Sequence, residues 1–222
     1  MPENSEPNQP RGHALRADAE RNRGRIIEAA RAVFAEQGLD APMNEVARRA
    51  GVGIATLFRR FPARDDLITA TFAGKMAAYA DAIDDALTDP DPWHGFCAYV
   101  ERVCAMQADD RGFTDVLTVT FPTAKGFKAD RNRAAAGFAE LIDRAKAAGK
   151  LRRDFAHQDL VLVLMANAGV VTGTGESAPD AWRRLVAYLL QSFAAEAARP
   201  LPPPPSEQQM YRALLRLQPK RD

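Results

Sequence analysis

The feature that most constrains the fold is a short stretch, residues 45–62, with the sequence EVARRAGVGIATLFRRFP. It contains two segments of helical period separated by Gly51, and helices this short are not stable alone in water. Glycine permits the tight turn between them, and the small Ala47 and Ala50 permit close approach of the two backbones. The stretch therefore predicts a helix-turn-helix that packs on other helices. The residues expected in its core are Val46, Val52, Leu57 and Phe61.

Charge is distributed unevenly along the chain. The whole sequence has a formal net charge of +1, whereas residues 41–64 contain five arginines and a single acid, Glu45. A local net charge of +4 fits a DNA backbone better than the average over the chain suggests. Alanine-rich hairpins with exposed arginines also occur in plain helical bundles, so this pattern alone leaves both readings open. In the DNA-binding reading, each residue of one set contacts the major groove, contacts a phosphate or packs in the core of the domain. This set is Ile54, Ala55, Thr56, Phe58, Arg59 and Arg60.

The remaining sequence is typical of an all-α protein. Apolar residues recur at helical period, glycines or prolines end most segments, and we find neither a strand pattern nor a repeat. Residues 157–173 are apolar on nearly every side, which indicates a helix buried all round. Residues 199–205 form a stiff, proline-rich connector. The other helices are expected at residues 21–38, 43–50, 54–61, 64–87, 93–110, 130–149, 178–198 and 206–218.

Residues 29–68, AARAVFAEQGLDAPMNEVARRAGVGIATLFRRFPARDDLI, closely resemble the N-terminal DNA-binding domain of TetR-family transcriptional regulators. The resemblance implies a three-helix domain that contains the helix-turn-helix, joined by a long fourth helix to a helical ligand-binding and dimerisation domain. We therefore expect a tail at residues 1–17, a DNA-binding domain at 18–64 and a regulatory domain at 65–222. The partners implied are a double-stranded, palindromic operator, an unknown small-molecule effector and a second copy of the chain.

The same resemblance assigns DNA contacts residue by residue. Thr56 matches a contact of the recognition helix, Arg60 stands in place of a frequent histidine, and Arg64 matches a residue that meets a phosphate. Arg59 or Arg60 would pair with a guanine, whereas Arg48 and Arg49 reach backbone or solvent. Weaker candidates lie in the N-terminal segment: Arg16, Arg21, Arg23 and Arg25.

Three departures from the family pattern affect this region. Phe58 replaces the usual tyrosine, whose hydroxyl bonds a phosphate. Pro42 replaces the usual Ser or Thr cap of the second helix, and Gly53 stands at the cap of the third. Each missing cap typically costs about 1 kcal/mol. We expect the fold to survive and the binding to depend more on arginine and backbone.

The C-terminal half resembles the family in architecture, and DPW at residues 91–93 with AAGKLRRDFAHQDLVLVL at 147–164 is similar to SbtR-like regulators. The resemblance implies ligand binding and dimerisation through the helices at 157–173 and 178–198. These apolar helices also serve, in the alternative reading, as the core of a monomer. The candidate interface residues are Leu162, Trp182, Leu185, Val186, Leu189 and Phe193.

An effector pocket is expected among apolar residues with a few fixed polar groups. Asn167 is such a polar group inside an apolar helix, and a bond across the dimer interface is an equal alternative for it. Residues at helical spacing are as often plain core. The candidate lining residues are Phe96, Val100, Val103, Met106, Phe113, Leu117, Phe121, Phe138, Met165 and Asn167.

Features of an enzyme are weak. His94, Cys97 and Cys104 share one predicted helix, but a structural zinc site needs a fourth ligand. GTGES at residues 173–177 lacks the lysine and the strand of a phosphate loop. We expect no catalytic residue, no metal, no cofactor, no membrane segment and a cytoplasmic location. The alternative to a regulator is a helical small-molecule-binding or interaction protein in which the hairpin is only structural.

Overall fold

The computed structural model describes residues 10–117 and 125–217. Within these residues the chain is helical, and its sole β-type pairing is an isolated bridge between Leu151 and Ala194. The all-α prediction is confirmed. The helices are α1 (Pro10–Gln37), α2 (Met43–Ala50), α3 (Ile54–Arg60), α4 (Arg64–Leu87), α5 (Pro92–Asp109), α6 (Arg111–Asp115), α7 (Lys128–Ala147), α8 (His157–Thr174), α9 (Ala181–Phe193) and α10 (Glu207–Leu217).

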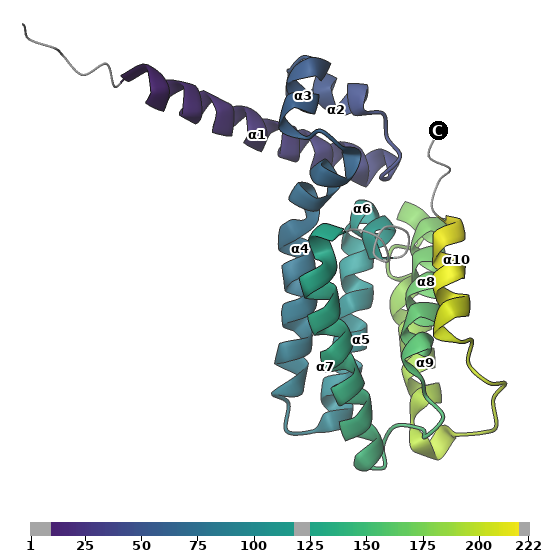
Figure 1. Ribbon diagram of the computed structural model, residues 1–222. Coiled ribbons are helices and arrows are strands. Elements are labelled where there is room, and N and C mark those ends of the chain that lie inside the picture. Colours follow the sequence, from purple (N-terminus) through teal and green to yellow (C-terminus); the bar gives the residue numbers. More distant parts are fainter. Residues whose placement is uncertain (1–9, 118–124, 218–222) are drawn as a thin grey trace, which may run out of the picture.

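Helices α1, α2 and α3 form a head at one end of the long helix α4, and the other helices form a bundle below it (Figure 1). The head is built around apolar residues that are fully buried, including Val33, Phe34, Val46 and Leu57. Val52 is partly buried and packs against the same core. The short helices α2 and α3 thus gain from the first helix the burial that they cannot supply alone.

Helix α1 begins earlier than the sequence suggested. We expected a helix from residue 21 and a tail over residues 1–17, whereas α1 begins at Pro10. Proline is tolerated in the first turn of a helix, and residues 14–20, ALRADAE, are mostly good helix formers. The N-terminal part of α1 extends beyond the head, away from the rest of the molecule (Figure 1).

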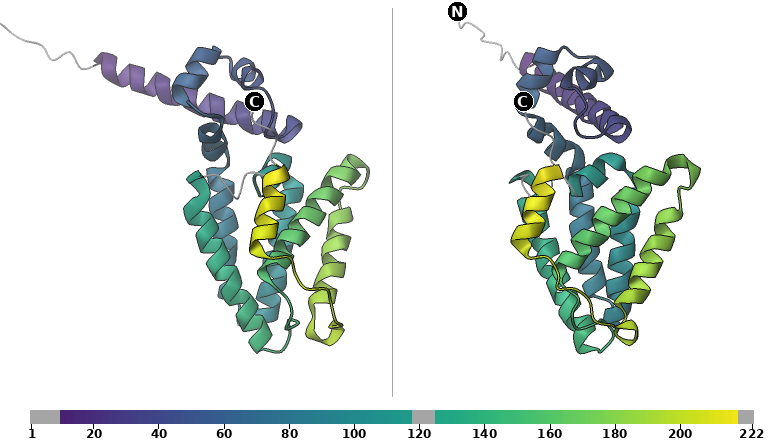
Figure 2. Two further views of the ribbon diagram at one scale, coloured as in Figure 1. Left: turned by 45° about the vertical axis from the view of Figure 1, so that its right-hand side comes forward. Right: turned by 90° about the vertical axis from the view of Figure 1, so that its right-hand side faces the viewer.

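The bundle has α5 at its centre. Helix α4 packs against α5 and α7, and α5 also contacts α8 and α9. The two views in Figure 2 show α8 and α9 on the side of α5 opposite α4. The sequence DPDP at residues 89–92 ends α4 and starts α5, because Asp91 accepts hydrogen bonds from the backbone nitrogens of Trp93 and His94 at 2.9 and 3.3 Å.

Helix α6 is the place where the bundle touches the head. The carboxylate of Asp115 accepts a hydrogen bond from the backbone nitrogen of Leu39, 3.3 Å away, at the end of α1. Gly112 allows this close approach, because a Cβ there would lie 2.8 Å from the ring of Phe72 and 3.2 Å from the backbone oxygen of Phe34. Helix α6 therefore contacts both α1 of the head and α5 of the bundle.

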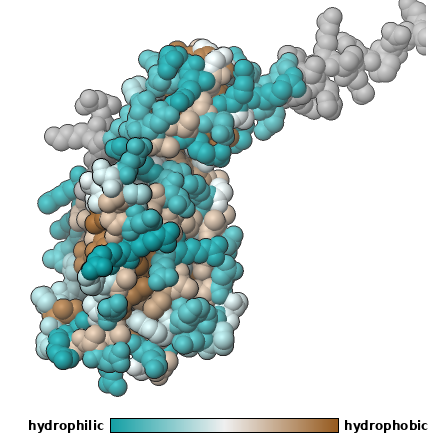
Figure 3. Space-filling view, turned by 180° about the vertical axis from the view of Figure 1, so that it is seen from behind, coloured by the Kyte–Doolittle hydropathy of each residue, from teal (hydrophilic) through white to brown (hydrophobic). Residues whose placement is uncertain are grey.

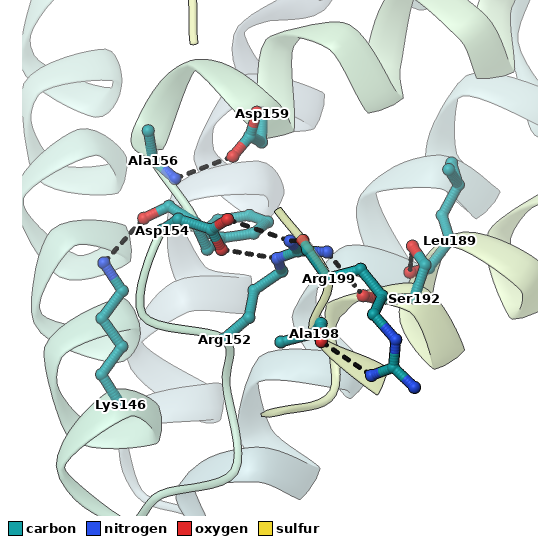
Figure 4. Close-up of polar contacts among 10 residues, drawn as sticks. Lys146, Arg152, Asp154, Ala156, Asp159, Leu189, Ser192, Ala198 and Arg199 are labelled. Atoms are coloured by element: carbon teal, nitrogen blue, oxygen red, sulfur yellow. Dashed lines mark hydrogen bonds and ion pairs between the residues drawn. The ribbon is translucent and has the colours of Figure 1, made fainter. Parts of the chain in front are cut away.

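The C-terminal segment crosses the end of the bundle and returns along it. Arg152 lies in the loop between α7 and α8, and only 5% of its side chain is exposed. Its guanidinium pairs with Asp154 at 2.6 and 2.9 Å and donates to the backbone oxygens of Ser192 and Arg199 at 3.2 and 2.6 Å (Figure 4). Beyond this anchor, an extended proline-rich segment leads to α10, which contacts α8 and buries Met210 and Leu214.

Candidate DNA interface

Helix α3 presents an apolar and basic face to solvent. Ile54 and Phe58 are 37% and 44% exposed, and Ala55, Arg59 and Arg60 are exposed beside them. Thr56 is half-buried and Leu57 is fully buried, so the helix is fixed to the head by one side. Exposed bulky apolar side chains next to arginines fit the contents of a major groove, where thymine methyl groups and guanine acceptors lie together.

The turn that sets the position of α3 depends on Gly51. This residue ends α2 in the left-handed conformation, with φ 64° and ψ 36°. The backbone nitrogen of Val52 donates to the oxygen of Ala47 at 3.0 Å, and that of Gly51 donates to the oxygen of Arg48 at 3.2 Å. These bonds satisfy the carbonyls of Ala47 and Arg48, in the last turn of α2, without any side chain. The prediction that glycine supplies this turn is confirmed.

The unusual cap residues have the consequence expected from the sequence. Among the described residues, neither Pro42 at the start of α2 nor Gly53 at the start of α3 makes a side-chain cap. The α3–α4 corner is better supported, because the carboxylate of Asp66 accepts from the backbone nitrogen of Ala63 at 3.0 Å. The position of α3 therefore depends on buried apolar contacts and on its connection to α4.

The arginines of α2 are paired within the protein. Arg48 donates to Glu45 through Nε and Nη2 at 2.9 and 2.6 Å, and Arg49 pairs with Glu36 at 2.5 Å. These bonds raise the pKa of both guanidinium groups and lower the pKa of both glutamates. By contrast, no ion pair within residues 10–117 and 125–217 includes Arg59 or Arg60. The uncompensated positive charge of the hairpin is thus concentrated on α3.

Arg64 has a partner that the sequence did not reveal. Its Nη1 atom donates to the backbone oxygens of Leu39 and Ala41, both at 2.7 Å, and so ties the start of α4 to the loop between α1 and α2. The resemblance assigned this residue to a DNA phosphate. Its partners lie 25 and 23 residues earlier in the chain, at a separation for which the local sequence carries no signal.

A cavity of about 820 Å³ lies where the head meets the bundle. Arg23 of α1 and Arg60 of α3 line it together with Asp65, Asp66 and Lys125, and Arg23 stacks over the ring of Phe61 at 5.7 Å. Arg60 thus borders both the outward face of α3 and the junction of the two halves. Among the predicted effector-binding residues that the structure describes, none lines this cavity.

The predicted effector residues lie instead within the bundle. Met106 and Met165 are partly buried. Asn167 is fully buried and donates to the oxygen of Cys104 and to Gln107 on α5, so its bonds lie inside the chain and not across an interface. Phe121 lies outside the described residues. The others form part of the apolar core: Phe96, Val100, Val103, Phe113, Leu117 and Phe138.

The predicted interface residues divide into two groups. Trp182 and Val186 are buried within the chain, whereas Leu162 is 43% exposed. Leu185, Leu189 and Phe193 are half-buried along the same side of α9. Hydrophobic residues are visible over the α8 and α9 side of the molecule in Figure 3.

The prediction that the helix at residues 157–173 is buried all round is wrong, because part of the apolar surface of α8 is exposed. With the turn that follows, residues 157–177 are long and apolar enough to cross a membrane, judged by length and composition alone. Within their 18-residue apolar window, only 22% is buried. The exposed face of α8 contains Ala166, Gly169 and Gly173 next to Leu162. A Cβ placed on either glycine would meet nothing within 4 Å, so another helix has room to approach closely.

Comparison with known sequence families gives two matches. Residues 26–71 match the family described as bacterial regulatory proteins, tetR family. Residues 91–192 match the C-terminal domain of SbtR-like transcriptional regulators. The first match covers the second part of α1, α2, α3 and the start of α4. The second covers most of the bundle and ends before the proline-rich segment and α10.

Individual proteins show the same similarity. The chain is 43% identical over 54 residues to an HTH-type transcriptional regulator of Staphylococcus aureus strain USA300, a match that spans 29% of that regulator's length. It is 30% identical to the TetR transcriptional regulator SCO0520 from Streptomyces coelicolor, covering 78% of this chain and 98% of that one with a TM-score of 0.49. FadR from Bacillus subtilis in complex with stearoyl-CoA has the same fold, with 16% identity, a TM-score of 0.51 and coverage of 80% and 100%.

Proposed function

Because the chain belongs to the TetR family of bacterial transcriptional regulators, we propose that it is a ligand-responsive repressor that binds a palindromic operator as a homodimer. Proteins of this family are regulators and not enzymes. The observation that carries the proposal is the outward face of α3, where Ile54, Ala55, Phe58, Arg59 and Arg60 are exposed. A helix that serves only as structure has no need to leave two large apolar side chains in water beside two guanidinium groups that form no ion pair within the described residues. The protein would bind its DNA and its effector in the cytoplasm.

We assign different tasks to the residues of this face. Arg59 and Arg60 provide charge, and a bidentate contact from one of them to guanine is worth roughly 1–3 kcal/mol of discrimination. Ile54, Ala55 and Phe58 supply apolar contacts to bases, and Phe58 does so without the hydroxyl that relatives direct to a phosphate. Thr56 is half-buried, so its hydroxyl reaches the DNA from the edge of the helix. Arg48, already held by Glu45, adds a weaker phosphate contact.

The proposed dimer forms through α8 and α9. The exposed small residues of α8 permit close helix packing, and Leu162, Leu185 and Leu189 lie beside them with incomplete burial. Trp182 and Val186 support this surface from within the chain. A two-fold axis there presents two copies of α3 to one duplex, which matches a palindromic site. The uncovered part of α8 would then lie against protein.

The effector would bind within the bundle. The complex of FadR with stearoyl-CoA supports the binding of an effector, because a protein of the same fold binds a small molecule. Contacts between α6 and the head provide the route by which binding changes the position of α3. For release of DNA, the effector needs a higher affinity for the conformation in which the two heads no longer fit successive major grooves.

Selection of bound fragments from genomic DNA tests the proposal. We expect enrichment of one palindromic sequence, with binding that weakens steeply as salt rises. Arg60→Ala should weaken binding and reduce the salt slope by about 0.9, the value for one phosphate contact. Arg153→Ala, which removes an exposed arginine in the α7–α8 loop, is the matched control and should leave both unchanged. Failure to enrich any sequence, or equal effects of the two variants, would contradict the proposal.

A further inference from the structure

Two amide side chains meet inside the bundle. Gln107 on α5 and Asn167 on α8 both have 0% of their surface exposed. The Nδ2 atom of Asn167 donates to the Oε1 atom of Gln107 at 2.9 Å and to the backbone oxygen of Cys104 at 3.1 Å. The pair therefore fixes α8 against α5 through a hydrogen bond between two residues that are 60 positions apart in the sequence.

Each amide is left with one unused polar atom. Within the described part of the chain, the Nε2 atom of Gln107 and the Oδ1 atom of Asn167 are buried and have no hydrogen-bond partner. Reversing the Asn167 amide would place its oxygen against two other oxygens, so the orientation is determined by its neighbours. Buried polar groups are nearly always paired, and two unpaired groups on neighbouring side chains indicate a missing partner.

The surroundings of the pair disfavour a charged partner. Val103 and Cys104 on α5, and Val163 and Leu164 on α8, are buried apolar residues next to it along the two helices. Burial raises the pKa of the Cys104 thiol to about 12, as expected where an ion is poorly solvated. An ionic ligand would lose its hydration there without gaining a counter-ion.

We infer that Gln107 and Asn167 form the polar end of the effector site and select an uncharged ligand whose head group places a hydrogen-bond acceptor beside a donor, as in a carboxamide or a lactam. The acceptor of the ligand accepts a hydrogen bond from the Gln107 Nε2 atom, and the donor of the ligand donates one to the Asn167 Oδ1 atom. This inference rests on the proposed function, because it specifies the chemistry of the effector that the regulator would sense.

The position of the pair connects it to the DNA-binding head. The hydroxyl of Thr114 on α6 donates to the backbone oxygen of Gln107 at 2.7 Å. The next residue, Asp115, accepts the hydrogen bond from Leu39, whose own oxygen accepts from Arg64. A ligand that shifts Gln107 thus acts on the segment of α6 that touches the head.

Three matched probes test the inference with the full-length protein: benzamide, toluene and benzoate. They share a ring and differ in the head group, which is an amide, a methyl group or a carboxylate. Titration calorimetry should show benzamide binding at least ten-fold more tightly than either other probe. Gln107→Met keeps a side chain of similar length but removes the Nε2 donor, so we expect benzamide to fall to the affinity of toluene while toluene itself is unaffected.

Several results would overturn the inference. These are equal affinities of the three probes for the natural protein, absence of binding by all three, or a benzamide preference that survives Gln107→Met. A crystal structure with benzamide in excess in which one water bridges the two amides would also overturn it, because the missing partner is then solvent. If Gln107→Met fails to fold, the affinities of the three probes for the natural protein still test the inference.

DNA binding is measured separately. Loss of the benzamide preference in a protein that still selects an operator refutes only the present inference. A clear preference in a protein that selects no DNA refutes only the proposed function.

Discussion

Replacing Arg64 with alanine separates a structural role from a DNA contact. In the structure its guanidinium bonds two backbone oxygens in the loop between α1 and α2. The variant removes both hydrogen bonds at once and leaves the oxygens of Leu39 and Ala41 without this donor. We therefore expect Arg64→Ala to lower the stability of the head first, and to affect operator binding through the position of α3.

The magnitude follows from the two bonds. A hydrogen bond that involves a charged group contributes roughly 1.5–3 kcal/mol. Arg64 is half-buried, so solvent screens part of this, and the lower end of the range applies to each bond. The expected loss is about 2–3 kcal/mol for the pair. For a domain of this size, each kcal/mol corresponds to about 2–4 °C, so the melting temperature should fall by about 4–12 °C.

The assay combines thermal unfolding with DNA titration. Circular dichroism at one protein concentration gives the melting temperature, and titration of the selected operator at several salt concentrations gives the slope. Arg60→Ala is the comparison, since its side chain is exposed and we expect an unchanged melting temperature with a reduced slope. The reasoning is refuted if Arg64→Ala keeps the natural melting temperature and loses as much salt slope as Arg60→Ala.

Other substitutions test the local geometry. Gly51→Ala forces a side chain into the left-handed conformation and should cost about 1–2 kcal/mol of stability in urea unfolding, whereas Gly53→Ala, at negative φ, should cost less. Arg152→Met removes the guanidinium bonds to Asp154, Ser192 and Arg199 and should cost about 3 kcal/mol, because the orphaned Asp154 is half exposed and stays hydrated. Limited proteolysis after residue 199 should accelerate in parallel. The Asp89 carboxylate raises the pKa of His94 above its ordinary 6.5, so the stabilisation by this pair is present below that pH and is lost as pH rises through the raised pKa. The urea midpoint of His94→Gln should therefore differ from that of the natural protein at about pH 5.5 and approach it at about pH 9.

Features determined by neighbouring residues were predictable from the sequence. DPDP at residues 89–92 indicated the end of a helix, and α4 runs from Arg64 to Leu87 as expected. Gly51 indicated the turn of the hairpin, and its backbone has the positive φ that a glycine allows. These signals depend on local geometry, which a single segment of chain determines.

Features that depend on distant partners were not predictable. The sequence marked Asn167 as a polar residue in an apolar helix but gave no means of pairing it with Gln107, which lies 60 residues away. Arg64 looked like any other arginine of the hairpin until the oxygens of the α1–α2 loop came next to it. The start of α1 at Pro10 was missed because its first turns have too few apolar residues to show a periodic face.

The C-terminal helix α10 is connected to the rest of the protein by a tether. Arg152 fixes the chain at Arg199, and the seven residues to the start of α10 span roughly 22 Å when extended. Such a tether gives α10 an effective concentration on the order of millimolar at its place on α8. The buried large apolar side chains of α10 are Met210 and Leu214, and we expect a free peptide of the same sequence to leave that place empty at micromolar concentration. The fraction of molecules with α10 bound to α8 is therefore independent of protein concentration. Cutting the chain between Arg199 and Glu207 makes this binding bimolecular, so that α10 dissociates on dilution.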